Sequence, residues 1–156
     1  MVKGSFVFVL LSLLSLLSGC VATPYYGNYV DKDSDIVNQV IANDAVTQLT
    51  QLYLPASTRF NLQHNTEDPF GVTFIENLRA GGYAISEHKS PAKPVLVKTA
   101  TADSVVPAEG AALAYVLDQT RDMYRLSVMV DDQILTRAYR PYKESIYPAG
   151  AWVRKE

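Results

Sequence analysis

The sequence predicts an α+β domain in which two helices pack on a mostly antiparallel sheet. Apolar residues recur at helical spacing in residues 33–53 and again in residues 68–80. Residues 124–139 alternate between apolar and polar on either side of Asp131-Asp132, a pattern typical of a β-hairpin. The chain has 156 residues, of which 48% are hydrophobic and 19% charged, so a single packed domain is expected.

Residues 1–19 have the pattern of an export signal. Lys3 supplies a positive charge, and residues 6–17 are apolar apart from Ser12 and Ser15. This run has the length of a signal-peptide core and is shorter than the roughly 20 residues that a membrane-spanning helix needs. We therefore expect residues 1–19 to be a lipoprotein signal peptide that is removed from the mature protein.

Leu17-Ser18-Gly19-Cys20 resembles the lipobox that the lipoprotein signal peptidase recognises. Cys20 is the only cysteine, so it cannot form an internal disulfide, and its thiol is predicted to carry lipid. Two or more acyl chains give a stable anchor, because each buried methylene contributes about 0.8 kcal/mol. Val21 stands where an Asp retains enteric-type lipoproteins in the inner membrane, which implies the periplasmic face of the outer membrane. The alternative is an ordinary signal peptide followed by a buried cysteine.

Residues 20–32 are predicted to be a tether between the lipid and the domain. They have no helical spacing, and Pro24 interrupts them. Tyr25, Tyr26 and Tyr29 are unusual in a spacer, since flexible spacers are commonly rich in Gly and Ser. These tyrosines favour either a contact with the bilayer surface or their own domain, or docking on a partner protein.

The domain is expected to span residues 33–156 and to begin with an amphipathic helix over residues 33–53. Its apolar residues are Ile36, Val37, Val40, Ile41, Ala45, Leu49, Leu52 and Tyr53. Acidic and polar residues at 33–35 favour the helix start, and Pro55 ends the helix. Residues 57–64 alternate and predict a strand.

A second helix is predicted to begin with Asp68 as its N-cap and Pro69 at its first helical position. Its apolar residues are Phe70, Phe74, Ile75 and Leu78. Gly81-Gly82 is expected to end the helix, because helices commonly end in a left-handed residue, for which glycine is favoured. Residues 83–86 then predict another strand.

The last part of the chain is predicted to be mostly β-structure. Residues 87–110 are polar, with residues 95–97 as a candidate edge strand. Residues 111–117 are apolar on both faces, as expected of a central strand. The hairpin of residues 124–139 follows, and residues 151–153 are a candidate final strand.

The sequence contains no recognisable catalytic or metal-binding pattern. His64 and His88 stand alone, outside any metal-ligand spacing. The carboxylates that are candidates for an acid–base pair are Glu67, Asp68, Asp118, Asp122, Asp131 and Asp132. Each also fits a turn or a helix cap, so we expect neither an enzyme nor a cofactor. The net charge of −2 argues against direct nucleic-acid binding, which favours a basic excess.

Arginine and aromatic residues gather towards the C-terminus. Arg125 and Arg137 fall on opposite arms of the predicted hairpin and are expected to share its outer face. The aromatic residues are Tyr124, Tyr139, Tyr142, Tyr147 and Trp152. Such residues anchor protein interfaces, but they also suit a half-buried sheet. Arg137 and Tyr139, like the tether tyrosines, are therefore candidate partner contacts, with a solvated sheet face as the alternative.

Several segments are similar to the TrbH lipoproteins of conjugative type IV secretion systems. They are Phe70-Gly71, residues 78–85, residues 113–119, residues 124–126, residues 135–139 and residues 150–156. The resemblance implies a part of the mating-pair apparatus at the outer membrane, with core-complex proteins as partners and a large oligomeric ring as its setting. It implies no catalytic residues. The helix-Gly-Gly-strand pattern also resembles the small periplasmic domain of secretins and of the DotD lipoprotein, in fold only.

The sequence thus predicts a structural lipoprotein that anchors or completes the core complex of a conjugative type IV secretion system for plasmid DNA transfer. The alternative is a pilotin-like chaperone lipoprotein that escorts an outer-membrane pore. A periplasmic hydrolase is a third hypothesis, which the scattered carboxylates support least.

Overall fold

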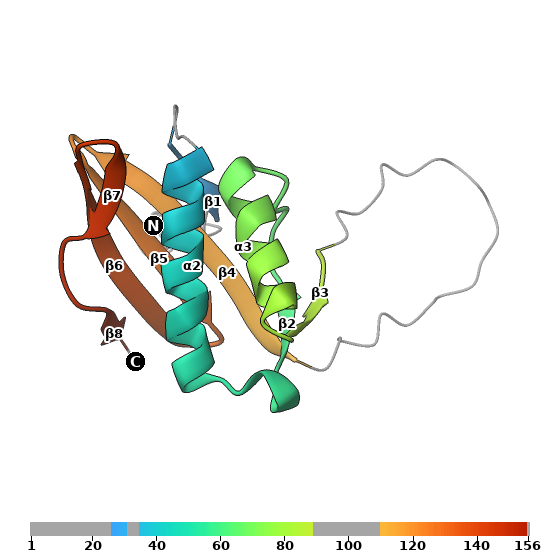
Figure 1. The fold of residues 1–156 in the computed structure, drawn as a ribbon. Coiled ribbons are helices and arrows are strands. Elements are labelled where there is room, and N and C mark those ends of the chain that lie inside the picture. Colours follow the sequence, from blue (N-terminus) through green and yellow to red (C-terminus); the bar gives the residue numbers. More distant parts are fainter. Residues whose placement is uncertain (1–25, 31–34, 89–109, 156) are drawn as a thin grey trace, which may run out of the picture.

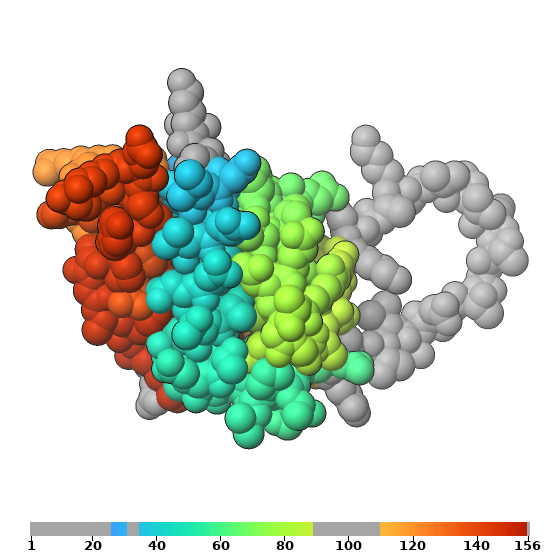
Figure 2. All heavy atoms as spheres, in the orientation of Figure 1, coloured from blue at the N-terminus to red at the C-terminus, as the bar shows by residue number. Residues whose placement is uncertain are grey.

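The computed structural model describes residues 26–30, 35–88 and 110–155. The predicted signal peptide, Cys20, Tyr25 and the candidate strand at residues 95–97 lie outside the described residues. Two helices, α2 (Asp35–Leu52) and α3 (Pro69–Ala80), lie side by side on one face of a mixed, mostly antiparallel sheet (Figures 1 and 2). The predicted α+β class is confirmed.

The sheet contains eight strands in the described part of the chain. They are β1 (Gly27–Asn28), β2 (Arg59–Leu62), β3 (Ala84–Ser86), β4 (Ala111–Thr120), β5 (Met123–Val130), β6 (Gln133–Tyr142), β7 (Ser145–Pro148) and β8 (Val153–Lys155). The main order is β3-β2-β4-β5-β6-β7, with β1 paired to β4 and β8 paired to β6. The predicted strands at residues 83–86 and 111–117 and the hairpin are confirmed. The strand predicted at residues 57–64 is confirmed over Arg59–Leu62, and a short 3-10 helix, η1 (Pro55–Ser57), precedes it. The candidate strand at residues 151–153 is found slightly later, as β8.

The two halves of the sheet differ in strand direction because of their connections. β4 to β7 run antiparallel through short turns, whereas β1, β2 and β3 pair in parallel. α2 connects β1 to β2, and α3 connects β2 to β3. A helical crossover brings the chain back to the end where it started, so the strands that it joins run in the same direction.

Residues close to each other in sequence define both ends of α3. An Asp68 carboxylate oxygen accepts a hydrogen bond from the Gly71 amide at 2.9 Å, and Pro69 occupies the first turn. At the other end, Gly82 has a φ of 89°. The Tyr83 amide donates to the Leu78 carbonyl at 3.1 Å, which closes the glycine-dependent helix end. The predicted N-cap and glycine termination are both confirmed.

The core lies between the helices and the sheet. Its largest fully buried side chains include Ile41 and Leu49 of α2, Phe70, Phe74 and Leu78 of α3, and Leu113, Tyr115, Leu126, Leu135 and Tyr139 of the strands. Alternation along each strand directs every second side chain to the helix side. The opposite face of the sheet carries no described helix.

The C-terminal end of the predicted tether belongs to the sheet. Gly27 and Asn28 pair with Val116 and Leu117 of β4, and the Tyr29 amide donates to the Leu117 carbonyl at 2.8 Å. β2 pairs with the first part of β4, so β1 continues along the same edge where β2 ends. The N-terminal segment is therefore attached to the domain well before α2 begins.

Candidate interaction surfaces

Tyr26 packs against its own domain. Its ring centre lies 5.6 Å from that of His64, and the His64 ring lies 4.5 Å from that of buried Tyr115. Tyr29, by contrast, is 50% exposed just beyond β1. Of the described N-terminal tyrosines, Tyr29 is therefore the one whose side chain is available to a partner.

His64 lies in a polar cluster that sequence spacing did not reveal. Both of its ring nitrogens are buried and lack a hydrogen-bond partner among the described residues. Burial lowers the pKa of His64, and the nearby Asp68 carboxylate opposes this shift. Tyr115 donates its hydroxyl hydrogen to Asp68. Contacts therefore run from Tyr26 in the N-terminal segment through His64 and Tyr115 to Asp68, the residue that caps α3.

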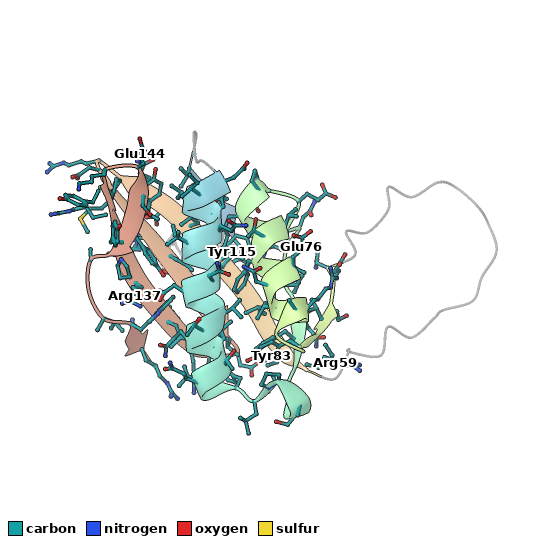
Figure 3. All side chains as sticks on the ribbon, in the orientation of Figure 1. Arg59, Glu76, Tyr83, Tyr115, Arg137 and Glu144 are labelled. Carbon is teal, nitrogen blue, oxygen red and sulfur yellow. The ribbon has the colours of Figure 1, made fainter. Side chains whose placement is uncertain are left out.

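Arg137 and Tyr139 contact Asp44 in the middle of α2. The Tyr139 hydroxyl donates to Asp44 Oδ2 at 2.7 Å, and Arg137 Nη1 lies 2.9 Å from Asp44 Oδ1. Arg137 Nε also donates to the Gly150 carbonyl at 2.8 Å, and the guanidinium lies 5.9 Å from the Trp152 ring centre. Arg137 accordingly lies beside α2 in Figure 3. These contacts tie α2 and the C-terminal segment to the sheet.

Burial corrects the expectation of a surface contact at Tyr139. Its side chain is fully buried beneath α2. Burial, followed by the hydrogen bond to Asp44, raises the pKa of Tyr139, so the phenol remains a hydrogen-bond donor. Arg137 is half-buried in the same contact. Both residues therefore serve the packing of the domain itself.

Arg125 and Arg137 lie on opposite faces of the sheet, so the expectation of a shared outer face is wrong. Arg125 is opposite Ala138, whereas Arg137 is opposite the buried Leu126. Paired residues of antiparallel strands share a face, and consecutive residues alternate. Arg137 therefore faces α2. Arg125 projects from the helix-free face, where it forms an ion pair with Asp118 at 2.6 Å.

Exposed aromatic, apolar and basic side chains gather where the β4–β5 and β6–β7 hairpins turn. We call the surface of Met123, Arg140, Tyr142, Lys143 and Tyr147 the hairpin-end surface. Tyr142 and Tyr147 are 56% and 53% exposed, and their ring centres lie 6.2 Å apart. Lys143 Nζ lies 5.3 Å from the centre of the Tyr142 ring. Tyrosine, methionine and arginine are enriched in protein interfaces.

Two shallow hollows make the hairpin-end surface uneven. One, of about 530 Å³, is lined by Arg140, Tyr142, Tyr147, Pro148 and Ala149. The other, of about 540 Å³, includes Met123, Arg125 and Ala138. The sequence shows that Tyr142 and Tyr147 belong to an aromatic-rich C-terminal stretch. The strand register is needed to place them near Met123 and Arg140 on the helix-free face.

A third hollow lies beside α3. Its lining includes Glu67 and Glu76, whereas the hairpin-end surface carries Arg140 and Lys143. We call the surface of His64, Glu67, Val72 and Glu76 the acidic hollow; its volume is about 250 Å³. Glu67 and Glu76 are exposed, and Val72 is 45% exposed. Arg79, at the rim, is already paired with Glu87. The acidic hollow therefore presents carboxylates beside an exposed apolar side chain.

Within residues 26–30, 35–88 and 110–155, no three His, Cys, Asp or Glu side chains come together as a metal site requires. In the same part of the chain, no helix has the length and hydrophobicity needed to cross a membrane.

A family model described as conjugal transfer protein TrbH matches residues 23–156. This match includes every described strand and helix. No curated protein and no solved structure matches the chain significantly. The family model describes proteins of conjugal transfer, not a family of enzymes.

Proposed function

We propose that this chain, which belongs to the TrbH family of conjugal transfer proteins, is a structural lipoprotein that holds the core complex of a conjugative type IV secretion system to the outer membrane. In this proposal Cys20 carries the lipid and the domain faces the periplasm. Partner contacts come from the N-terminal segment, through Tyr25 and the exposed Tyr29, and from the hairpin-end surface; Tyr26, which packs on His64, holds the segment to the domain.

The family match over residues 23–156 carries this proposal. It supports a role in the transfer apparatus for the whole domain, rather than for one short motif. The hairpin-end surface supports a role through binding, because exposed Tyr, Met and Arg side chains beside shallow hollows are typical of protein interfaces.

Chain length supports a domain that stays close to the membrane. Cys20 precedes Tyr26 by six residues, which span at most about 20 Å when fully extended. Tyr26 itself is packed on His64, and β1 is paired with β4. Once lipidated, the domain would therefore be confined near the membrane, where a weak contact with another anchored or ring-forming protein is strengthened by proximity.

The test compares the full chain with its Cys20→Ser variant in cells that carry the complete transfer system. We expect a radioactive fatty acid to label the wild type alone, and core-complex proteins to co-purify with it from outer membranes. Equal labelling of both forms would refute lipidation at Cys20. If the chain instead co-purifies with an outer-membrane pore protein, and does so only while that pore assembles, the result would support the pilotin-like alternative.

A further inference from the structure

We propose that the hairpin-end surface of one copy binds the acidic hollow of a second copy, head to tail. This inference rests on the proposed function, because lipid anchoring would place many copies in one membrane. The partner of the hairpin-end surface is then a second copy of this chain.

The hairpin-end surface supplies two free cations beside two exposed aromatic rings. Arg140 is exposed and forms no ion pair with any described residue, and Lys143 contacts the ring of Tyr142. Arg125, which lies nearby, is paired with Asp118. Arg140 and Lys143 are therefore available to a partner, with Tyr142 and Tyr147 as apolar anchors. Arg121, in the β4–β5 turn, adds an exposed cation, and Glu144, beside Lys143, adds one exposed carboxylate.

The acidic hollow supplies the complementary groups. Glu67 and Glu76 have no ion-pair partner in the described part of the chain, and Val72 lies beside them at the hollow.

The two surfaces lie on opposite sides of the molecule. In Figure 3, Glu144 in the β6–β7 turn and Glu76 on α3 lie on opposite sides of α2. The strand order agrees, since β7 is at one edge of the sheet and β3, next to α3, is at the other. A contact between unlike surfaces on opposite sides can be repeated from copy to copy, and it closes into a ring if the rotation permits.

Charge argues against contact between two identical hairpin ends. Such a symmetric contact would place Arg140 and Lys143 of one copy near the same cations of the other, with Glu144 as the one carboxylate of the β6–β7 turn to offset them. An excess of like charges across an interface is unfavourable. Exposed ion pairs add little affinity by themselves. In the head-to-tail contact, the charges therefore select the partner surface, while burial of Tyr142, Tyr147 and Val72 supplies the attraction.

The test is disulfide crosslinking of the full chain in membranes. Ala149→Cys lies at the hairpin-end hollow and Asn65→Cys at the acidic hollow, and neither change alters a charged or apolar side chain of the proposed contact. Oxidation of the double variant should give a ladder of dimers, trimers and larger species on a non-reducing gel. The matched control combines Ala149→Cys with Ala56→Cys, at an exposed position outside both surfaces, and should give no ladder.

Charge reversal tests the chemistry of the contact. Arg140→Glu with Lys143→Glu should reduce the ladder about fivefold or more, and adding Glu67→Lys with Glu76→Lys to the same chain should restore it. A ladder that stops at the dimer, an unchanged ladder after charge reversal, or a crosslink to a different protein would overturn the proposal. If no ladder forms while fatty-acid labelling and core co-purification persist, the inference fails and the proposed function stands. Loss of labelling in the wild type would contradict the proposed function itself.

Discussion

Asp44 accepts hydrogen bonds from two side chains of β6 while lying at the centre of α2. Arg137 and Asp44 are only 19% and 24% exposed at their side chains, so water screens this ion pair less than a surface pair. Tyr139, the other donor, is fully buried. Loss of the carboxylate would leave the buried Tyr139 hydroxyl without its acceptor, and would leave Arg137 with its hydrogen bond to the Gly150 carbonyl but without its ion pair.

We therefore expect Asp44→Ala to lower the free energy of unfolding by roughly 2–3 kcal/mol. The measurement is urea unfolding followed by circular dichroism. The matched control is Arg125→Ala, which removes an ion pair whose Arg side chain is 59% exposed and should cost less than about 1 kcal/mol. Equal effects of the two substitutions would show that Asp44 does not connect α2 to the sheet.

His64 should make stability depend on pH. Burial lowers its pKa below the ordinary value of 6.5 in the folded protein. Between the lower folded pKa and 6.5, the unfolded chain binds a proton that the folded chain does not, so stability decreases as pH falls through this window. Above 6.5, His64 is neutral in both states and contributes no slope.

The urea midpoint of the wild type should therefore decrease as the pH is lowered below about 6.5. His64→Gln should reduce this slope, because glutamine does not titrate. His88→Gln, at an exposed position, provides the control and should retain most of the slope, because the charge of His88 is the smallest of the three causes that act on the pKa of His64. If His64→Gln has the same pH dependence as the wild type, protonation of His64 is not coupled to folding.

At the scale of single elements, the end of α3 depends on one glycine. Gly82 has a φ of 89°, in the region that L side chains rarely adopt. A Cβ at this position would meet no atom nearer than Pro55 Cβ at 3.7 Å, so a larger residue would be opposed by backbone strain rather than by crowding.

Gly82→Val should destabilise the domain by about 1–3 kcal/mol. Gly150→Val is the matched control, because a Cβ at Gly150 meets no atom within 4 Å and its φ lies outside the positive region. Thermal or urea unfolding of both variants measures the difference. An unchanged midpoint for Gly82→Val would show that the helix end tolerates a β-branched residue.

At the scale of the whole molecule, exposed tyrosines and core tyrosines occupy different parts of the sheet. Tyr142 and Tyr147 are exposed at the hairpin end, whereas Tyr115 and Tyr139 are fully buried under the helices. Substitution of the exposed pair should therefore affect binding and leave folding unchanged.

Tyr142→Ser with Tyr147→Ser should keep the wild-type melting temperature to within a few degrees. The same variant should lower plasmid transfer and co-purification with the core complex, because truncation of an interface aromatic commonly costs about 2 kcal/mol or more of binding energy. Leu54→Ser, at a 70% exposed position away from the hairpin end, is the control. Wild-type transfer by the tyrosine variant would exclude the hairpin-end surface as a contact.

Features that depend on residues close together in the chain could be predicted from the sequence. The Asp68 cap, the Gly81-Gly82 helix end and the β5–β6 hairpin were all predictable because each depends on residues a few positions apart. The two-helix α+β class could be predicted from the periodic spacing of the apolar residues. The family could be predicted from scattered segments that are similar to TrbH lipoproteins. The parallel pairing of β1 was not predictable, because a two-residue strand has too few residues to show a period.

Which side chains are available to a partner depends instead on long-range packing. Tyr139 and Tyr142 lie three positions apart, yet one is fully buried and the other is 56% exposed. The difference arises because α2 covers one face of the sheet and brings Asp44 to Tyr139 across 95 positions of sequence. Strand alternation tells which residues share a face, but the face that the helices cover is set by long-range packing. In β6 the local pattern does not indicate this face clearly, because the charged Arg137 lies on the helix side between Leu135 and Tyr139.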